Sequence, residues 1–212
     1  MQSIADIRKE YKLQVLDEHL AEKNALDQFD KWWSDAISSG IEEVNACTLA
    51  TANAAGKPSA RIVLLKGYDA DGFVFFTNYE SHKGKELAVN PYACMVFFWK
   101  ELERQVRIEG TVKKISEGES NAYFNSRPQG SRIGAWASPQ SQIIESRKII
   151  EENAAMFEAK FEGSTIARPA CWGGYCLQPA MIEFWQGRPS RLHDRLQYNK
   201  EPNGWKMLRL AP

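Results

Sequence analysis

The sequence predicts a mainly β protein, a β-barrel with helices at its periphery. Short runs rich in β-branched and aromatic residues recur between turn signals such as Asp71-Gly72 and Asn203-Gly204. Runs with helical spacing lie at the edges of these strands, and no repeat or low-complexity linker interrupts the 212 residues. Hydrophobic residues make up 43% of the chain and charged residues 25%, so we expect a packed core rather than disorder.

Two helices are expected at the start of the chain. Ser3 is a suitable N-cap for apolar residues that keep helical spacing up to Tyr11. Apolar residues at about 26–38 also line one helix face, and Gly40 follows the end of that helix. We therefore expect a helical N-terminal extension at about 1–40.

The remaining elements follow from local patterns. Strands are expected at about 47–51, 59–65, 73–77, 92–99, 104–115, 173–177, 181–186, 191–197 and 205–210. Further helices are expected at about 81–89, 117–126 and 145–161. The first of these should end at Asn90-Pro91, because the residue before proline disfavours helical geometry.

Charge and motifs exclude several classes of protein. Lys plus Arg and Asp plus Glu number 27 each, so we expect no nucleic-acid-binding surface. No apolar run of about 18 residues and no secretory signal occur, so we expect a cytoplasmic protein without a membrane span. The four cysteines lack C-x-x-C spacing, which argues for buried free thiols and against a metal site. Nucleotide-binding glycine motifs and a G-x-S-x-G elbow are also absent.

The clearest candidate site is the run Arg191-Leu192-His193-Asp194-Arg195. Side chains alternate between faces along a strand, so Arg191, His193 and Arg195 should share one face. Three cationic groups side by side call for an anionic or electron-rich partner opposite them. A solvated strand whose charges pair with nearby carboxylates explains the pattern equally well.

A second candidate site consists of Tyr123, Arg127 and Ser131. Tyr123 and Arg127 are four residues apart, so they are neighbours on one helix face. Pro128 should end that helix, and Ser131 should lie on the glycine-containing loop that follows. A guanidinium, a phenol and a hydroxyl would make a phosphate pocket. From these residues alone, an ordinary helix terminus remains the simpler explanation.

A third candidate segment is the strand at 61–66, in which two cations flank four apolar residues. Its residues are Arg61, Ile62, Val63, Leu64, Leu65 and Lys66. In a regular strand Arg61 and Lys66 would point to opposite faces and serve two anions, unless a bulge changes the parity. A buried strand with charged ends is the alternative.

Together, these segments resemble the pyridoxine (pyridoxamine) 5'-phosphate oxidase family from about residue 7 to residue 212. The resemblance is carried by RIVLLK at 61–66, FFTN at 75–78, LERQVRIEG at 102–110, YFNSRP at 123–128, SRIGAWAS at 131–138, FWQG at 184–187, RLHDR at 191–195 and the C-terminal LAP. Each motif alone is weak, but their shared order along the chain is specific.

The resemblance implies a fold and a reaction. The fold would be an FMN-binding split β-barrel, with 1–212 as a single domain and a homodimer that holds flavin at its interface. The reaction would convert pyridoxine 5'-phosphate or pyridoxamine 5'-phosphate to pyridoxal 5'-phosphate, in vitamin B6 biosynthesis and salvage. Dioxygen would accept the electrons and leave as hydrogen peroxide, and the amine substrate would also release ammonia.

The resemblance also implies roles for individual residues. The flavin contacts would be Arg61, Ile62, Val63, Leu64, Leu65, Lys66, Phe76, Thr77, Lys83, Gln105, Gln140, Ser141, Trp185 and Arg195. The substrate contacts would be Lys66, Tyr123, Arg127, Ser131, Arg191, Leu192 and His193, with Arg191 and His193 as the catalytic pair. The N-terminal Arg8, Lys9, Glu10 and Tyr11 resemble a segment that closes over the substrate.

The chain departs from the family pattern at residue 82. The family usually has Arg-Lys at this place, whereas this chain has His82-Lys83. Histidine is shorter and is neutral over part of the physiological pH range. We therefore expect Lys83 to keep the contact with the flavin phosphate, and His82 to make a weaker contact with the flavin site or none.

Two other functions are compatible with parts of the pattern. A related split-barrel flavoprotein that uses a nicotinamide cofactor would keep the flavin residues, but it would need neither the RLH run nor the Y-x-x-x-R pair. A carrier of pyridoxal 5'-phosphate would bind the aldehyde without turnover. A yellow sample that releases peroxide identifies the oxidase, and a colourless one that only binds the aldehyde identifies the carrier.

Overall fold

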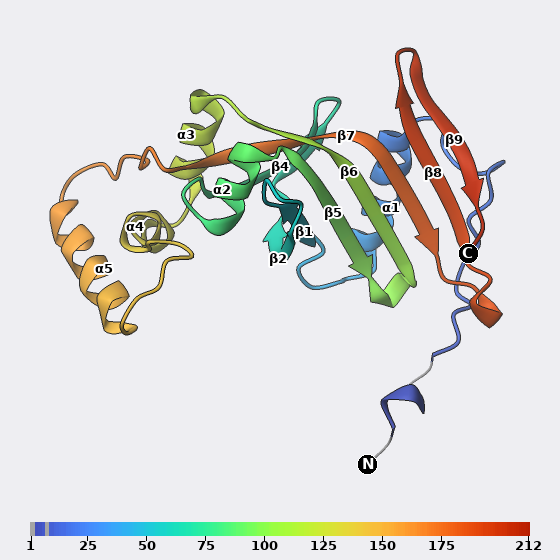
Figure 1. Cartoon of the computed structure of the whole chain (residues 1–212), viewed down its shortest axis with the longest axis horizontal. Coiled ribbons are helices and arrows are strands. Elements are labelled where there is room, and N and C mark those ends of the chain that lie inside the picture. The colour runs from blue at the N-terminus through green and yellow to red at the C-terminus, as the bar shows by residue number, and fades with distance from the viewer. Residues whose placement is uncertain (1–2, 7–8) are drawn as a thin grey trace.

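The computed structural model describes residues 3–6 and 9–212, and its main feature is a curled antiparallel sheet (Figure 1). Within the described residues the sheet has nine strands in the order β2-β1-β5-β6-β7-β4-β3, with β8 paired to β7 and β9 paired to β8. The strands are β1 (Ala46–Ala52), β2 (Pro58–Leu64), β3 (Gly67–Asp69), β4 (Gly72–Asn78), β5 (Tyr92–Trp99), β6 (Arg104–Lys114), β7 (Trp172–Gln186), β8 (Asp194–Glu201) and β9 (Gly204–Leu210). The mainly β fold with peripheral helices is confirmed.

Strand β7 is one continuous strand of 15 residues, where the sequence predicts two shorter ones. Its first part lies between β4 and β6, and its last part lies between β6 and β8. The proline that separates the predicted strands, Pro179, sits opposite Gly110 at a shift of register, so its missing N–H falls at a bulge. Gly110 is required there, because a Cβ would lie 1.9 Å from the carbonyl oxygen of Gln178.

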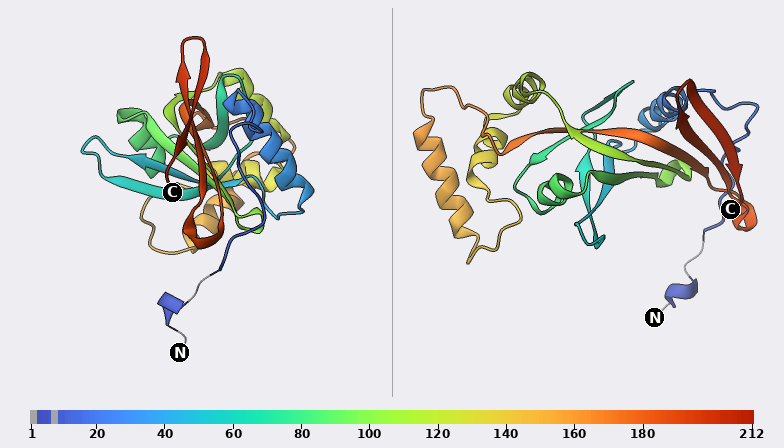
Figure 2. Two further views of the ribbon diagram at one scale, coloured as in Figure 1. Left: turned by 90° about the vertical axis from the view of Figure 1, so that its right-hand side faces the viewer. Right: turned by 45° about the horizontal axis from the view of Figure 1, so that its top comes forward.

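Five α-helices in the described residues flank the sheet (Figures 1 and 2). They are α1 (Ala25–Ser38), α2 (His82–Val89), α3 (Glu117–Ser126), α4 (Gln129–Ala137) and α5 (Lys148–Lys160). The short 3₁₀ helices are η1 (Ile4–Asp6), η2 (Lys100–Leu102) and η3 (Pro189–Arg191). Figure 2 shows α4 and α5 near one end of the molecule and the β8–β9 hairpin at the other.

The helix expected from Ser3 to Tyr11 is wrong. Residues 7 and 8 lie outside the described residues; of the described residues in this part only η1 is helical, and residues 9–16 have no regular secondary structure. The amide groups of Lys12 and Leu13 donate to the carboxylate of Glu103, about ninety residues further on. A tertiary contact therefore holds the chain directly after the expected helix.

Two hydrophobic cores pack against β7: the larger includes Tyr175, Leu177, Ile182 and Phe184, and the smaller includes Trp172. In the larger core, Phe29 on α1 meets Phe73 with ring centroids 4.9 Å apart, and Trp32 meets Phe184 at 5.2 Å. The smaller core, under α3, α4 and α5, includes Phe124 and Trp172. Both ends of β7 are therefore packed in a hydrophobic core.

The cysteines are free thiols, as expected. Cys47 and Cys176 are buried, and burial raises the pKa of Cys47 to about 12, whereas Cys94 and Cys171 are only half-buried. Among residues 3–6 and 9–212, no three His, Cys, Asp or Glu side chains gather to hold a metal ion. In the same residues, none of the helices combines the length and apolar character needed to cross a membrane.

Candidate active site

Most of the predicted site residues form two groups, one toward each end of β7. The α4 end comprises Arg61, Phe76, Thr77, Lys83, Tyr123, Arg127, Ser131, Gln140 and Ser141. The β8 end comprises Gln105, Trp185, Arg191, Leu192, His193 and Arg195, together with Lys9, Glu10 and Tyr11. Trp172 marks the first end of β7 and Trp185 lies near the second, on the order of 40 Å apart along the strand.

At the α4 end, a partly buried lysine is bonded to two predicted flavin residues. Lys83 lies in the first turn of α2, and its Nζ donates to Thr77 Oγ1 at 3.0 Å. Thr77 Oγ1 donates in turn to Gln140 Oε1 at 3.1 Å. Burial lowers the pKa of Lys83, and the positive charge of Arg61 lowers it further. An anion bound here would relieve that repulsion.

Behind this cluster, the buried carboxylate of Glu86 organises its neighbours. Its Oε2 accepts hydrogen bonds from Thr51 Oγ1 at 2.5 Å and Ser59 Oγ at 2.6 Å, and lies 3.5 Å from Arg61 Nη2. His82 Nε2 lies 3.0 Å from Glu86 Oε1, so the histidine is directed at this carboxylate. Burial acts to raise the pKa of Glu86, but the two hydroxyls and the charges of His82 and Arg61 outweigh it, so the pKa falls below its usual value.

A pocket of about 220 Å³ brings together Arg127, Ser131 and Gln140. The Nη1 atom of Arg127 is buried and has no hydrogen-bond partner among the described residues, and its guanidinium lies 4.6 Å from the ring of Trp172. Burial lowers the pKa of Arg127, against the effect of Tyr123. A buried guanidinium donor without a partner is costly, so this pocket is suited to an anion.

The loop expected around Ser131 is wrong, because Ser131 lies in the first turn of α4. Pro128 ends α3 as predicted, but it is also the N-cap residue of α4. A proline tolerates the start of a helix because its missing N–H would have no intrahelical partner there. The hydroxyl of Ser131 therefore stands near a helix N-terminus, where anions are favoured.

Aromatic rings connect the predicted flavin and substrate residues at this end. Phe76 and Tyr123 stack with ring centroids 3.9 Å apart, and Phe76 stacks on Trp172 at 5.4 Å. Phe76 lies on β4 and Tyr123 on α3, so the stack also fixes the helix against the sheet. The structure thus brings a predicted flavin residue and a predicted substrate residue into contact.

At the β8 end, the shared strand face expected for Arg191, His193 and Arg195 is wrong. Arg191 belongs to η3 and has a positive φ of 62°, and β8 begins only at Asp194. Ser190 also has a positive φ, of 55°, which breaks the extended geometry that the alternation requires. Of the three, only Arg195 lies on a strand.

His193 nevertheless faces a pocket. A space of about 500 Å³ is lined by Lys9, Glu10, Tyr11, Arg188, Ser190, Arg191 and His193. The backbone N–H of Arg188 donates to His193 Nδ1 at 3.1 Å, and the imidazole lies 4.5 Å from the ring of Trp185. Burial lowers the pKa of His193, the charge of Arg191 lowers it further, and Asp194 partly offsets both.

Arg195 is held in place by a carboxylate that the sequence reasoning did not single out. Its Nε donates to Glu183 Oε1 at 2.8 Å, and Arg107 Nη2 donates to Glu183 Oε2 at 2.5 Å. Arg195 lies opposite Trp185 in the sheet, and Trp185 lies opposite Gln105. Glu183 and Trp185 are two residues apart on one strand, so their side chains share a face of the sheet. The alternation of side chains along the strand could therefore have identified Glu183 as a neighbour of the predicted site.

The remaining predicted residues are more scattered. Arg8 lies outside the described residues. Lys66 is exposed after β2, and its backbone N–H donates to the carbonyl oxygen of Val74. Leu65 is buried in the larger core, and Val63 packs against that core. Leu64 is half-buried, whereas Ile62 and Leu192 are exposed. Ser141 is also exposed and has a φ of 67°.

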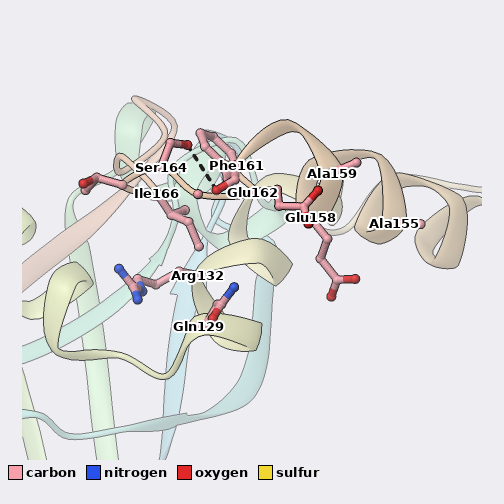
Figure 3. A pocket seen from close by; sticks show the side chains of 11 residues that line it. Gln129, Arg132, Ala155, Glu158, Ala159, Phe161, Glu162, Ser164 and Ile166 are labelled. Atoms are coloured by element: carbon pink, nitrogen blue, oxygen red, sulfur yellow. Dashed lines mark hydrogen bonds between the residues drawn. The ribbon is translucent and has the colours of Figure 1, made fainter.

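A pocket of about 800 Å³ between α4, α5 and the segment after α5 holds none of the predicted residues (Figure 3). Arg132, Glu158 and Glu162 are among the residues that line it, so its charges are mixed. The side chains of Gln129 and Arg132 leave α4 in different directions (Figure 3). We therefore place the candidate site in the two smaller pockets at the ends of β7.

Two family models match the chain. The model described as pyridoxamine 5'-phosphate oxidase matches residues 34–160. The model described as the pyridoxine 5'-phosphate oxidase C-terminal dimerisation region matches residues 172–212. The first covers more than half of the chain, and the second covers β7, β8 and β9.

Full-length relatives carry the same description. The pyridoxine/pyridoxamine 5'-phosphate oxidase of Paraburkholderia phymatum is 59% identical over 213 residues, with 100% of both chains covered. The protein of that name from Cyanothece is 54% identical, with 99% of both chains covered.

Solved structures show the same fold. PhzG from Burkholderia lata 383, solved in complex with tetrahydrophenazine-1-carboxylic acid, superposes with a TM-score of 0.88 at 30% identity, covering 94% of this chain and 99% of that chain. An FMN binding protein from Nostoc punctiforme, related to pyridoxamine 5'-phosphate oxidase, superposes with a TM-score of 0.69 at 17% identity, covering 87% and 97%.

Proposed function

The chain belongs to the pyridoxamine 5'-phosphate oxidase family, and from this premise we propose that it oxidises pyridoxine 5'-phosphate or pyridoxamine 5'-phosphate to pyridoxal 5'-phosphate with bound FMN. The observation that carries the proposal is the buried, unpartnered Nη1 of Arg127 in the pocket with Ser131. A phosphate group would supply the acceptor that this guanidinium lacks. The start of α4 would add its helix dipole to the same oxygen atoms.

The cations at the α4 end support a second anionic group, the phosphate of FMN. Arg61 and Lys83 repel each other, and the lowered pKa of Lys83 indicates that its charge is poorly compensated. Arg61, Thr77, Lys83 and Gln140 would hold the flavin phosphate, and Glu86 would hold Arg61 in position. A bound FMN would supply the two-electron redox chemistry of the reaction, with dioxygen as the final acceptor of two electrons and two protons and hydrogen peroxide as the by-product.

The distance between the two groups supports a site shared by two copies of the chain. Arg127 and His193 lie toward opposite ends of β7, too far apart to touch one substrate within a single chain. In a homodimer, the α4 end of one copy would meet the β8 end of the other, with the flavin at the interface. The match of residues 172–212 to a dimerisation region supports this arrangement.

In the proposed site, Arg191 and His193 would orient the reacting group of the substrate. His193 Nδ1 accepts the N–H of Arg188, so a neutral imidazole carries its proton on Nε2 and offers a donor to the pocket. The lowered pKa favours that neutral form near neutral pH. His193 would bond the oxygen or nitrogen on the reacting carbon, and Arg191 would fix the ring from beside it. With the amine substrate, hydrolysis of the imine product would release ammonia.

We also propose that residues 1–212 act as one FMN-binding unit. Strand β7 lies in the second family match, yet it pairs with β4 and β6, which lie in the first. Because these strands share backbone hydrogen bonds, separating the two matched regions would expose the edges of β4 and β6.

A peroxide assay on the purified protein tests the proposal. We expect a yellow protein that contains FMN and releases one hydrogen peroxide for each pyridoxal 5'-phosphate formed, with either phosphorylated substrate. A yellow protein that produces no peroxide and requires a nicotinamide cofactor would be a reductase, and a colourless protein that binds the aldehyde would be a carrier. Oxidation of a reduced phenazine carboxylic acid, with no action on pyridoxine 5'-phosphate, would also refute it.

A further inference from the structure

The N-terminal strap, residues 9–16, forms one wall of the pocket that contains His193. Lys9, Glu10 and Tyr11 line this pocket. The ring of Tyr11 meets the ring of Trp185 edge-on at 5.8 Å and lies 6.0 Å from the imidazole of His193. The strap has no helix or strand of its own, so other contacts must hold Tyr11 there.

Glu103 provides those contacts next to Tyr11. Its Oε2 accepts the backbone N–H groups of Lys12 at 2.8 Å and Leu13 at 3.1 Å, and its Oε1 lies 3.1 Å from Lys9 Nζ. The side chain of Glu103 is only 2% exposed. Burial acts to raise its pKa, but the bonds from Leu13, Lys9 and Lys12 outweigh burial and lower it. The carboxylate is thus ionised and fully engaged with the strap.

The backbone around Glu103 is shaped for this contact. Glu103 has a φ of 55° in the turn between β5 and β6, a conformation that is uncommon outside glycine. Its carbonyl oxygen accepts the N–H of Gly187 at 2.7 Å. A Cβ on Gly187 would lie 2.7 Å from Cγ of Tyr11, so only glycine lets the ring approach this closely. This turn therefore carries the anchor of the strap, and its carbonyl oxygen also binds Gly187, the residue after β7 against which Tyr11 packs.

Among residues 3–6 and 9–212, the other hydrogen bonds to the strap involve its later residues, Gln14 and Leu16. The carbonyl oxygen of Gln14 accepts from Arg188 Nη1 at 3.2 Å, and the N–H of Leu16 donates to Asp194 Oδ2 at 3.1 Å. Loss of the Glu103 carboxylate would therefore release residues 9–13 while residues 14–16 stay attached. The fold would be kept and one wall of the pocket would open.

We propose that Glu103 is a positioning residue for substrate binding: it fixes Tyr11 against Trp185 and His193 and so keeps the pocket closed on the side of the strap. Its catalytic consequence rests on the proposed function. Substrate retained between the strap and Arg191 would escape faster without the anchor, so the Michaelis constant should rise more than turnover falls.

The test compares Glu103→Ala, Glu103→Gln and Lys9→Met with the wild type. The control is Glu101→Gln, two residues away, whose exposed carboxylate contacts only Lys100 at 3.9 Å among the described residues. Hydrogen exchange of the Lys12 and Leu13 amides is measured without substrate, and KM and kcat with pyridoxine 5'-phosphate. In Glu103→Ala we expect exchange to rise at least roughly tenfold at these amides but not at Leu16, because a charge-assisted acceptor is lost.

We expect KM to rise roughly tenfold in Glu103→Ala with kcat within about a factor of two, a loss of about 1.4 kcal/mol in binding. Lys9→Met and Glu103→Gln should fall between this variant and the wild type, and Glu101→Gln should match the wild type. Unchanged exchange of the Lys12 and Leu13 amides in Glu103→Ala, or faster exchange with an unchanged KM, would overturn the proposal for Glu103. Such a result would leave the proposed oxidase function intact as long as the wild type is active. If Glu103→Ala does not fold, Gly187→Ala takes its place, because the added Cβ displaces Tyr11 while the Glu103 carboxylate stays intact. This variant should raise KM by the same factor as Glu103→Ala. An unchanged KM in Gly187→Ala would also overturn the proposal.

Discussion

Replacing Arg127 by alanine should weaken binding of phosphorylated substrates selectively. One buried donor of Arg127, Nη1, lacks a partner in the described residues, so the substitution removes at least one charge-assisted hydrogen bond to the proposed phosphate. Such a bond contributes about 1.5–3 kcal/mol. The Michaelis constant for pyridoxine 5'-phosphate should therefore rise about 10- to 150-fold, with a smaller change in kcat.

The assay compares two substrates that differ only in the phosphate. Wild type and Arg127→Ala are measured with pyridoxine 5'-phosphate and with pyridoxine, which has no phosphate group. Arg127→Lys serves as a control that keeps the charge but loses the planar pair of donors, and it should lie between the two. The guanidinium also packs 4.6 Å from Trp172, so thermal unfolding is measured to confirm that all variants are folded.

The prediction depends on whether the loss caused by Arg127→Ala is larger for the phosphorylated substrate than for the unphosphorylated one. We expect the substitution to reduce kcat/KM strongly for pyridoxine 5'-phosphate and little for pyridoxine. An equal loss for both substrates would show that Arg127 supports the pocket without contacting phosphate. An unchanged KM for the phosphorylated substrate would remove Arg127 from the site altogether.

The other predictions concern the cations and the histidine of the site. Arg191→Ala should lower turnover far more than FMN retention, measured by flavin absorbance after gel filtration; equal losses would assign Arg191 to the flavin. His82→Arg should tighten FMN binding in a fluorescence titration, because an arginine keeps its charge and reaches further than a histidine directed at Glu86; unchanged affinity would take position 82 out of the phosphate site. The lowered pKa of His193 places the acidic limb of kcat/KM below pH 6.5, since activity is lost only when the pH falls through that lowered value. Arg191→Gln should move this limb to higher pH, and a limb that stays in place would exclude His193 as its source.

Local sequence patterns predicted most of the sheet. The hairpins at Asp71-Gly72 and Asn203-Gly204 form as expected, and both glycines have positive φ values, of 140° and 134°. Each hairpin turn is determined by residues that are adjacent in the sequence, so local sequence patterns are enough to predict it. The prediction of the N-terminal helix was wrong in a part of the chain that Glu103 holds: this distant residue binds the amides of Lys12 and Leu13, directly after the expected helix, and no local pattern reveals it.

Two further errors come from residues with more than one conformational role. Pro128 ends α3 and also precedes α4, so treating it only as a helix stop left Ser131 in a loop. Ser190 and Arg191 adopt positive φ values that their side chains do not favour, which removed the predicted alternation. Family resemblance supplied the identities of the site residues. The sequence did not predict that these residues form two groups far apart. That separation became visible only in the structure, where β7 continues past Pro179 as one long strand.

Mixing two variants that are each impaired at low substrate concentration tests the shared site most directly. Arg127→Ala and Arg191→Ala chains, each with a different affinity tag, are co-expressed, and the heterodimer is purified and assayed with pyridoxine 5'-phosphate well below the wild-type Michaelis constant, where the raised KM of the first variant and the lowered turnover of the second both reduce the rate. If each site joins the α4 end of one chain to the β8 end of the other, one site collects both substitutions and the other collects none. The heterodimer should then regain about half of the wild-type activity. A heterodimer no more active than its parents under the same low-substrate conditions would show that Arg127 and Arg191 act within one chain and would contradict the account.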